Sequence, residues 1–485
     1  MNFISLRFLI FAGFLLPLFF LVPARWKWLC LLVASYVFYS FAGINAVVLL
    51  AVSTVLVYAA ALGLERTRTP RMRRLVFELG LISGLIGLLV FKYTDFFGRL
   101  FFSAAGIFKA GIVYKPLGLA YIVGLSFYTF KSISYLVDVY REKMAAEKHF
   151  GYFALYVSFF PQLLMGPIDR AVRFIPELKK RVSLDFDRLA SGIELIAWGI
   201  FKKVAVADRL ALFVNDVFAQ PDNQGLYLLL AAYIYAFQIY CDFSGYIDMA
   251  IGFSRILGYD SMENFRTPYA SRSLPEFWSR WHISLSTWLR DYLFLPIAYW
   301  VLRVIKSPSL LLIKAEAWAY GIAIIITWTL GGLWHGAAWN FVVFGVAHGI
   351  YLLLSNSTKK GRRRFVRWIR LDQLPTLRHA IQVFITFNLV SLAWIFFRAE
   401  SLTAALAFLQ NISQWIPATR RGLVVFDIVL ILLVIGLEAF FKKHARWPAW
   451  QKLPRPLRTA AFALFLCLIM ILAMDANNEF IYFNF

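Results

Sequence analysis

Charged residues are scarce in this sequence: Asp, Glu, Lys and Arg make up only 16% of its 485 residues, whereas 61% are hydrophobic. A soluble domain does not need so much apolar surface, so the composition excludes a soluble globular protein. Apolar runs recur from one end of the sequence to the other. The sequence therefore predicts an all-α, polytopic transmembrane helical bundle rather than a string of separate domains.

Several motifs of common sites are also missing. The three cysteines, Cys30, Cys241 and Cys467, have no paired spacing, which excludes a disulfide framework and a cysteine-based zinc site. No HExxH motif or close His/carboxylate cluster occurs, so we expect no metal. The sequence lacks a GxSxG elbow and a glycine-rich phosphate loop. It also lacks the internal repeats that a transporter often carries.

Acidic residues are few relative to basic ones, 27 against 50, which gives a formal net charge of +23. The basic residues cluster in short segments between apolar runs, at 66–74, 359–370 and 442–458. This distribution is typical of cytoplasmic loops beside anionic lipid and argues against nucleic-acid binding. We therefore expect membrane lipid, and no nucleic acid, among the partners.

The apolar runs are long enough for about eleven membrane spans plus re-entrant or interfacial helices. Candidate spans are 5–22, 28–42, 46–64, 75–91, 116–138, 152–166, 189–206, 226–254, 318–333, 338–355, 380–398, 423–441 and 460–475. The first run has no small-residue cleavage site, so we interpret it as a retained span. With the basic loops cytoplasmic, both termini are predicted to lie outside. Residues 256–300 carry many charges among aromatic residues, which predicts a re-entrant element open to the cytoplasm.

Two of the six histidines follow a tryptophan, in RWHISLS and GGLWHGAAW. His335 lies among glycines at the junction of two apolar runs, where it could act as a general base on a hydroxyl or thiol, or cap the helix break. His282, beside Arg280, could share proton transfer or bridge helices. His348 lies on an apolar face and is more typical of a core residue.

Carboxylates also lie within one apolar run. In YIYAFQIYCDFSGYIDMAIGFSRIL, helical spacing places Gln238, Asp242 and Gly245 on one face, while Asp248 need not share it. A carboxylate within a span marks a site or pairs with a cation. For each carboxylate alone, an ion pair with an arginine of 266–290 is an equally good interpretation.

Five runs resemble the membrane-bound O-acyltransferase superfamily, and within it the alginate O-acetyltransferase branch. They are GLSFYTFKSISYLVDVYR (124–141), FFPQLLMGPIDR (159–170), YCDFSGYIDMAIGFSRILGY (240–259), NFRTPYASRSLPEFWSRWHISLSTWLRDYL (264–293) and GGLWHGAAWNFVVFGVAHG (331–349). The ending EFIYFNF is similar to that branch as well. The resemblance implies a single domain over residues 1–485, with N-terminal spans (1–115), a core with the motif histidines (116–355) and C-terminal spans (356–485). It also implies helices arranged around a central tunnel.

The resemblance further implies a site and a reaction. His335 matches the family's essential histidine and His282 its second motif histidine, and both are expected to be catalytic. Supporting residues are expected to be Asp242, Arg280, Asp291, Trp334 and Asn340. The protein is then expected to lie in a bacterial inner membrane, with no bound cofactor. It would take an acetyl group from acetyl-CoA or another cytoplasmic acyl thioester, and relay it to an extracytoplasmic SGNH-type acetyltransferase that modifies a polysaccharide.

Two alternatives stay open. One is D-alanyl transfer to teichoic acid, and the other is a non-enzymatic polytopic transporter. The sequence also departs from the alginate pattern after RDYL, because residues 294–316 are apolar and lysine-bearing where relatives have a Gly-Gly-Asn run. The polymer that receives the acyl group is therefore not fixed by the resemblance.

Overall fold

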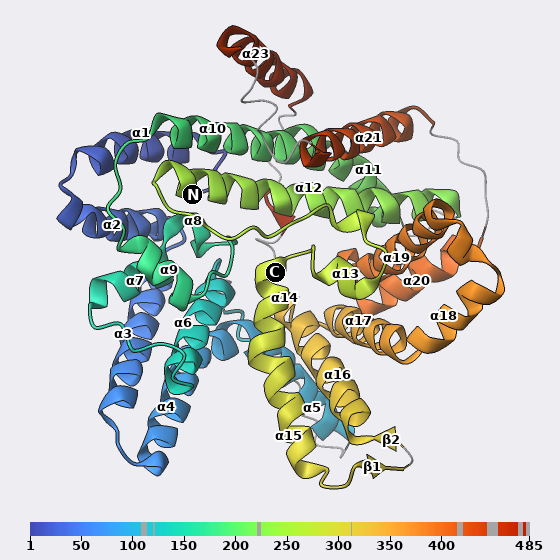
Figure 1. Ribbon diagram of the computed structural model, residues 1–485, viewed down its shortest axis with the longest axis horizontal. Coiled ribbons are helices and arrows are strands. Elements are labelled where there is room, and N and C mark those ends of the chain that lie inside the picture. Colours follow the sequence, from blue (N-terminus) through green and yellow to red (C-terminus); the bar gives the residue numbers. More distant parts are fainter. Residues whose placement is uncertain are drawn as a thin grey trace. The chain divides into compact units, whose positions relative to one another are not determined.

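The computed structural model describes residues 1–107, 114–119, 122–220, 225–311, 313–414, 421–443, 454–473 and 479–481. Within these ranges the chain is almost entirely helical, which confirms the all-α prediction. The chain forms two compact units (Figure 1): unit 1 comprises Met1–Ile196 and Met249–Glu263, and unit 2 comprises Ala197–Asp248 and Asn264–Phe485. The division of one domain into three parts at 115 and 355 stays a prediction.

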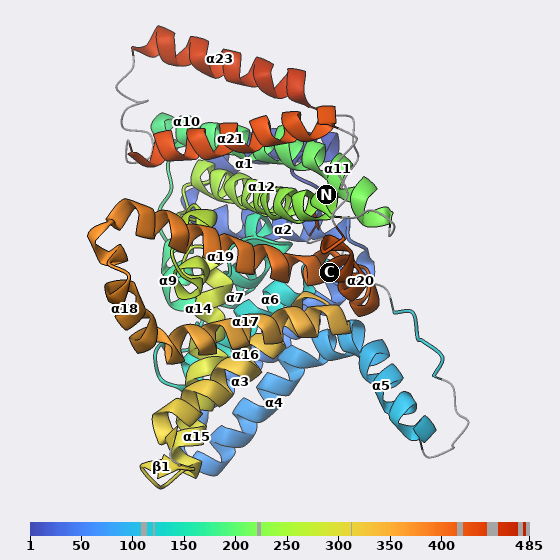
Figure 2. The ribbon, with the colours of Figure 1, turned by 90° about the vertical axis from the view of Figure 1, so that its right-hand side faces the viewer.

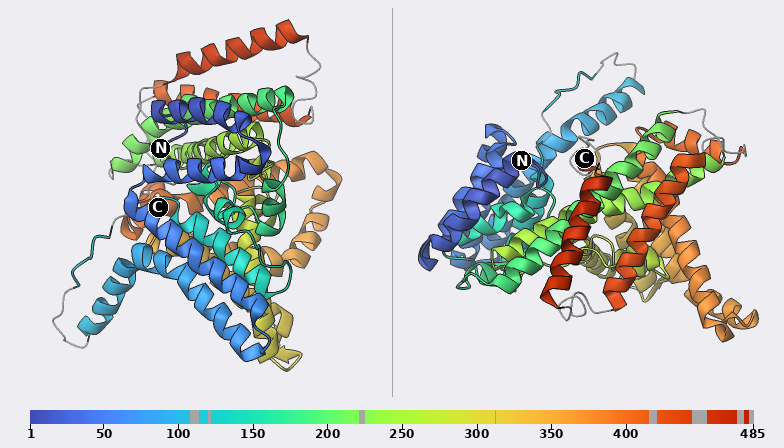
Figure 3. Two further views of the ribbon diagram at one scale, coloured as in Figure 1. Left: turned by 90° about the vertical axis from the view of Figure 1, so that its left-hand side faces the viewer. Right: turned by 90° about the horizontal axis from the view of Figure 1, so that it is seen from above.

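Unit 1 is built from the N-terminal helices. They are α1 (Leu6–Leu21), η1 (Ala24–Trp26), α2 (Lys27–Ser40), α3 (Ile44–Arg66), α4 (Pro70–Leu88), η2 (Leu89–Tyr93), α5 (Thr94–Ile107), α6 (Leu125–Tyr140), α7 (Phe150–Ser158), α8 (Phe160–Leu163), α9 (Ala171–Leu178) and most of α10 (Phe186–Ile200). Helices α3 and α4 form a hairpin that packs against α6 (Figures 1 and 3). Gly80 of α4 makes this close packing possible, since a Cβ there would lie 2.6 Å from Ala60 Cβ.

A buried polar chain crosses unit 1. Lys131 Nζ of α6 donates to Gln162 Oε1 at 2.8 Å, and Gln162 Nε2 donates to Asp169 Oδ2 at 2.8 Å. The carboxylate of Asp169 also pairs with Arg173 at 2.7 Å. Sequence analysis did not single out these residues, although Lys131, Gln162 and Asp169 lie in two of the runs that resemble the family. Each buried polar group is thus given a partner, which is what burial requires.

Unit 2 contains the later helices. They are η3 (Phe201–Ala207), α11 (Asp208–Ala219), most of α12 (Leu226–Ile256), η4 (Pro268–Ala270), α13 (Leu274–Trp278), α14 (Ile283–Leu289), η5 (Arg290–Phe294), α15 (Leu295–Val304), α16 (Ala315–His335), α17 (Trp339–Ser357), α18 (Lys359–Trp368), η6 (Leu371–Gln373), α19 (Pro375–Arg398), α20 (Leu402–Ile412), α21 (Arg421–Lys443) and α23 (Arg455–Leu472). Two short antiparallel strands, β1 (Ser309–Leu310) and β2 (Ile313–Lys314), join α15 to α16. Helices α16 and α17 lie side by side as a hairpin (Figures 1 and 2).

Within the described ranges, six helices are long and apolar enough to cross a membrane: 44–66, 70–103, 226–256, 315–335, 339–357 and 375–398. Shorter apolar helices cover 6–21, 402–412 and 456–472. The multi-pass helical character is confirmed, whereas the estimate of eleven spans stays a prediction. One candidate span needs correction, because 152–166 folds as α7 and α8, which are interrupted at Phe159. Pro161, at the start of α8, has no N–H to continue a helical ladder.

The segment predicted to be re-entrant, 256–300, is broken into short pieces only as far as His282. After α12 the chain forms only the three-residue η4 and the five-residue α13, whereas α14, η5 and α15 follow one another without a break as one helix from Ile283 to Val304 (Figure 1). Thr267 and His282 have left-handed backbone conformations, with φ of 44° and 43°. Residues 257–282 therefore place polar backbone and side chains at several turns. The access of this segment to the cytoplasm stays a prediction, and so does the central tunnel.

Candidate functional site

The α16–α17 hairpin of unit 2 is held together by glycines. A Cβ on Gly332 would lie 2.2 Å from the carbonyl oxygen of Phe341, and one on Gly345 would lie 2.1 Å from that of Trp328. Side chains at these positions would force the helices apart, so the two glycines permit backbone contact. The hairpin turn follows His335 directly, because α16 ends at this residue. Close packing thus fixes the position of the first motif histidine.

His335 is enclosed by aromatic rings. Its side chain is only 5% exposed, and its ring centre lies 4.8 Å from that of Trp334 and 5.1 Å from that of Phe397 on α19. Phe344 on α17 lies 5.8 Å away on another side. The imidazole is therefore held by three elements, α16, α17 and α19, and largely kept from bulk water.

His282 lies in a tight turn between α13 and α14. Its side chain is fully buried, and its Nδ1 lies 3.4 Å from Asn264 Oδ1. The same amide oxygen of Asn264 accepts from Ser284 N at 2.9 Å, while the Asn264 backbone carbonyl accepts from Ile283 N. Asn264 therefore fixes the turn that presents His282. Sequence analysis missed this asparagine, although it lies in the matched run at 264–293.

Trp334 connects the two motif histidines. Its ring centre is 6.2 Å from that of His282 and 4.8 Å from that of His335. The two imidazoles are therefore separated by no more than the sum of these distances, and the structure brings together the two residues predicted to be catalytic. The ring of Phe243 on α12 packs edge-on against His282 at 4.8 Å. Burial lowers the pKa of His282 to about 3, so its imidazole is neutral at physiological pH.

His348 belongs to the same aromatic cluster. It is fully buried on α17, where Trp278 Nε1 donates to its Nδ1 at 3.3 Å, and its ring centre is 4.8 Å from that of Phe344. Phe344 therefore contacts both His335 and His348. This burial agrees with the expectation that His348 is a core residue. The ring of Phe344 connects His348 to His335.

Asp242 lies in a buried ion-pair cluster on α12. Its Oδ1 is 2.8 Å from Lys203 Nζ, and Lys203 is also 2.8 Å from Asp208 Oδ1. The alternative that Asp242 pairs with an arginine of 266–290 is therefore wrong. The partner comes from η3, since Gly245 lets η3 approach α12: a Cβ there would lie 2.7 Å from Gly199 O. A lysine pair inside the candidate span 189–206 was the signal in the sequence that could have identified this partner.

The neighbouring lysine makes a second buried pair. Lys202 Nζ contacts Asp248 Oδ2 at 2.5 Å and donates to Ser244 Oγ at 2.8 Å. Asp242, Gly245 and Asp248 thus all face η3. The two lysines thus pair with three carboxylates, so that each buried charge has a partner of opposite sign.

Three residues from the end of the chain dock on this cluster. Ile481 N donates to Asp242 Oδ2 at 2.9 Å, and Lys203 Nζ donates to the Glu479 carbonyl at 3.3 Å. Phe480 is fully buried, with the Lys203 ammonium 4.6 Å from its ring centre. The described part of the EFIYFNF ending therefore completes the hydrogen bonding of Asp242. The rest of that ending, the residues 444–453 with His444, and part of the third basic loop lie outside the described residues.

Three further residues predicted to support the site have other partners. Arg280 pairs with Glu276 at 2.5 Å, and Asp291 of η5 pairs with Arg290 at 2.8 Å. Asn340 Nδ2 donates to the Ala399 carbonyl at 2.9 Å and to that of Phe396 at 3.2 Å.

Asn340 therefore ties the start of α17 to the end of α19, the helix that carries Phe397 beside His335. Burial raises the pKa of Glu276, but hydrogen bonds and charge from Arg272 and Arg280 outweigh burial and lower it overall. The roles of Arg280, Asp291 and Asn340 in catalysis stay predictions. In the described ranges, no group of three or more His, Cys, Asp or Glu side chains could hold a metal ion.

Several known proteins are similar to this sequence over more than half of its length. A probable alginate O-acetylase of Azotobacter vinelandii is 38% identical over 401 residues, which cover 82% of this chain and 74% of the relative. A peptidoglycan O-acetyltransferase of Helicobacter pylori is 29% identical over 96% of this chain and 92% of its own length. A teichoic acid D-alanyltransferase of Bacillus subtilis is 29% identical, over 59% of this chain and 71% of the relative.

The profile of one protein family also matches, over residues 146–396. These residues include Lys202 and Lys203, Asp242, the three buried histidines and Phe344. With a match over more than half of the sequence and relatives above 30% identity, the chain belongs to the membrane-bound O-acyltransferase family, MBOAT.

Proposed function

We propose that this O-acyltransferase moves an acetyl group from a cytoplasmic thioester toward an extracytoplasmic polysaccharide, with His335 as general base and His282 as its assistant. The observation that carries the proposal is the pair of buried imidazoles that both lie against the ring of Trp334. A neutral imidazole in a site with little water can accept a proton from a hydroxyl. Relatives named as alginate O-acetylase and peptidoglycan O-acetyltransferase support the acetyl group and an extracytoplasmic acceptor.

The reaction balances without a metal or redox partner. His335 takes the proton of the attacking hydroxyl as its oxygen forms a bond to the acetyl carbonyl carbon. The carbon–sulfur bond of the thioester then breaks, and the leaving thiolate receives the proton from the histidine. The acceptor gains the acetyl ester, and the donor leaves as a free thiol. Exclusion of water around the aromatic cluster would suppress hydrolysis of the thioester.

The proposal also names an acyl donor, a partner protein and a location in the cell. Acetyl-CoA is the proposed donor, and an SGNH-type transferase outside the membrane is the proposed partner that carries acetyl groups to the polymer. We place the protein in a bacterial inner membrane with both termini outside, because the basic segments at 66–74 and 359–370 fit cytoplasmic loops.

Replacing His335 with Gln tests the catalytic role. Glutamine is close in size and polar but cannot exchange a proton, so acetyl ester on the cell's exopolysaccharide or wall glycan should fall at least about a hundredfold. Acetate released by mild base is measured by chromatography, after immunoblotting has shown equal membrane levels. Unchanged acetate would contradict the proposal.

A second histidine supplies the control. His149 is exposed and accepts from Tyr152 N at the start of α7, a role that asparagine can also fill. His149→Asn should therefore keep wild-type acetylation. Measuring D-alanine in the same base extract separates the alternative suggested by the teichoic acid D-alanyltransferases, because loss of D-alanine rather than acetate would identify that reaction.

A further inference from the structure

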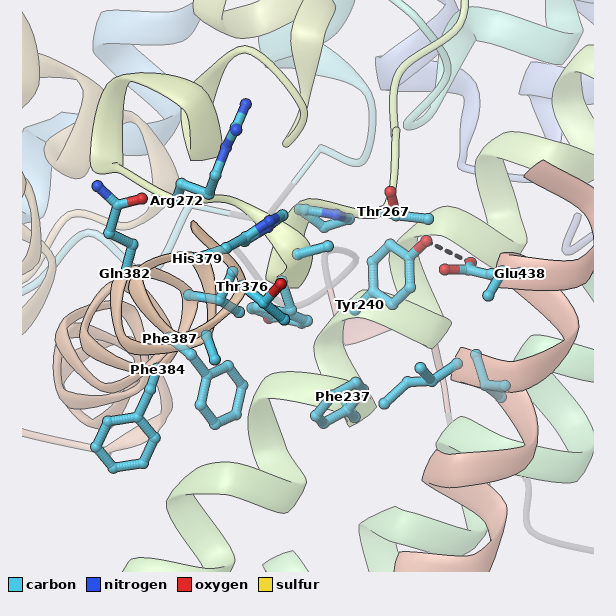
Figure 4. A pocket seen from close by; sticks show the side chains of 18 of the residues that line it. Phe237, Tyr240, Thr267, Arg272, Thr376, His379, Gln382, Phe384, Phe387 and Glu438 are labelled. Atoms are coloured by element: carbon cyan, nitrogen blue, oxygen red, sulfur yellow. Dashed lines mark hydrogen bonds between the residues drawn. The ribbon is translucent and has the colours of Figure 1, made fainter. Parts of the chain in front are cut away.

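A large groove opens in unit 2 among α12, η4, α19 and α21 (Figure 4). Its volume is about 1140 Å³, slightly larger than ordinary ligand sites, which span roughly 300–1,000 Å³. One end is apolar and is formed by Phe237, Phe384 and Phe387 with Val434 and Ile435. His282, His335 and Trp334 do not line it. The groove is therefore separate from the candidate acyl-transfer site.

The groove runs along a helix that spans the membrane. Its wall on α19 extends from Pro375 to Phe387, which at 1.5 Å per residue is about 18 Å. Half of a typical hydrocarbon core is about 15 Å. Phe384 is 65% exposed on this span, so the groove is open on the side that faces lipid tails. Its length and opening thus match one leaflet of a bilayer.

The opposite end of the groove is polar and carries both signs of charge. Arg378 and His379 lie in the first turns of α19 and line the groove, as does Arg272, which pairs with Glu276; Figure 4 shows His379 and Arg272. Glu438 on α21 accepts a hydrogen bond from Tyr240 on the other side. Cations on one wall and a carboxylate on the other complement a headgroup that has a phosphate and an amine.

We propose that this groove binds one phospholipid with a phosphoethanolamine headgroup. The phosphate contacts Arg378 and His379, the ammonium group donates to Glu438, and an acyl chain lies along Phe237, Phe384 and Phe387. A wholly polar donor would leave the aromatic end of the groove unfilled. A glycerol headgroup would present hydroxyl groups rather than an ammonium group to Glu438, and so would lack the charge-assisted hydrogen bond. The bound lipid would fill the space among α12, α19 and α21.

Native mass spectrometry tests this site. The full-length protein, purified in mild detergent, is mixed with equal amounts of dioleoyl phosphatidylethanolamine, phosphatidylcholine and phosphatidylglycerol, and retained lipid is counted by headgroup. We expect one phosphatidylethanolamine to be retained preferentially. Glu438→Gln should lower its preference over phosphatidylcholine at least about fivefold, since one charge-assisted hydrogen bond is lost. Arg378→Gln should lower retention of all three lipids.

Matched controls lie outside the groove. Glu400→Gln and Arg364→Gln change exposed charges after α19 and on α18, so both should retain lipid as the wild type does. Equal retention of the three headgroups by the wild type, or a preference for phosphatidylglycerol, would overturn the assignment. So would groove variants that bind like the controls. If Glu438→Gln fails to fold, lipid retention by Arg378→Gln still tests the site, because Arg378 is exposed. No acyl donor is added, so the result is independent of the proposed acetyl transfer.

Discussion

His282 combines a side chain proposed to be catalytic with a strained backbone. Its φ of 43° is rare for residues other than glycine and asparagine, and the residue is held there by Asn264. No residue in RWHISLS predicts a left-handed backbone conformation at His282. The turn arises because Ile283 and Ser284 both donate to Asn264, which lies eighteen positions before the histidine.

The substitution His282→Asn distinguishes the contribution of the imidazole from that of the left-handed backbone conformation. Asparagine tolerates the left-handed conformation, so thermal unfolding of the purified variant should stay close to that of the wild type. Acetylation of the polymer should fall about a hundredfold or more if the imidazole takes part in proton transfer. Arg370→Asn is the control, because Arg370 has a φ of 56° on an exposed turn. A variant that folds and acetylates normally would remove His282 from the mechanism.

The buried pairs of η3 predict an asymmetry in stability. Lys203→Met leaves Asp208 and Asp242 without their shared cation, and losing one partner of a buried pair costs about 3–5 kcal/mol. Asp242→Asn leaves Lys203 paired with Asp208, so the cost should be smaller, about 1–2 kcal/mol. Denaturant unfolding in detergent measures both values. Equal losses would show that Asp208 does not compensate for Asp242.

At the scale of elements, the glycines of the α16–α17 hairpin decide where His335 lies. Gly345→Ala would place a Cβ 2.1 Å from the Trp328 carbonyl, so the helices must separate and both thermal stability and acetylation should fall. Gly321→Ala on α16 is the matched control, since its Cβ would lie 3.6 Å from Leu353 Cδ1. That substitution should be neutral or stabilise by up to about 1 kcal/mol, because alanine favours helix. Opposite effects of the two variants on unfolding temperature would confirm the close packing.

Other elements were predictable in kind but not in detail. The length of the apolar runs indicated most long helices. The charges of 256–300 indicated the broken stretch up to His282, but not the continuous helix that follows from Ile283 to Val304. The candidate span 152–166 failed because a proline and a bend at Phe159 outweigh the apolar composition. The partner of Asp242 could not be chosen from sequence spacing, because lysines of η3 and arginines of 266–290 are equally plausible cations until the packing at Gly245 is known.

At the scale of the whole molecule, orientation in the membrane can be tested with single cysteines. In a variant without Cys30, Cys241 and Cys467, a cysteine at Glu400 should react with a membrane-impermeant maleimide in spheroplasts. One at Arg364 should react only after lysis, because the basic residues of α18 are expected to stay on the cytoplasmic side. The reverse labelling pattern would invert the predicted topology.

The sequence by itself determined that this protein is a helical membrane protein, since apolar composition and periodicity are properties of the chain alone. The Trp-His motifs and the matched runs were enough to indicate the family and the two histidines. Only the tertiary structure decided that both histidines contact Trp334, that Lys203 rather than an arginine holds Asp242, and that the chain's end docks on that pair. The physical reason is that ion pairs and ring contacts depend on which helix faces meet. Close approach at glycines and a single left-handed turn set those faces, and neither has a period that can be recognised along the chain.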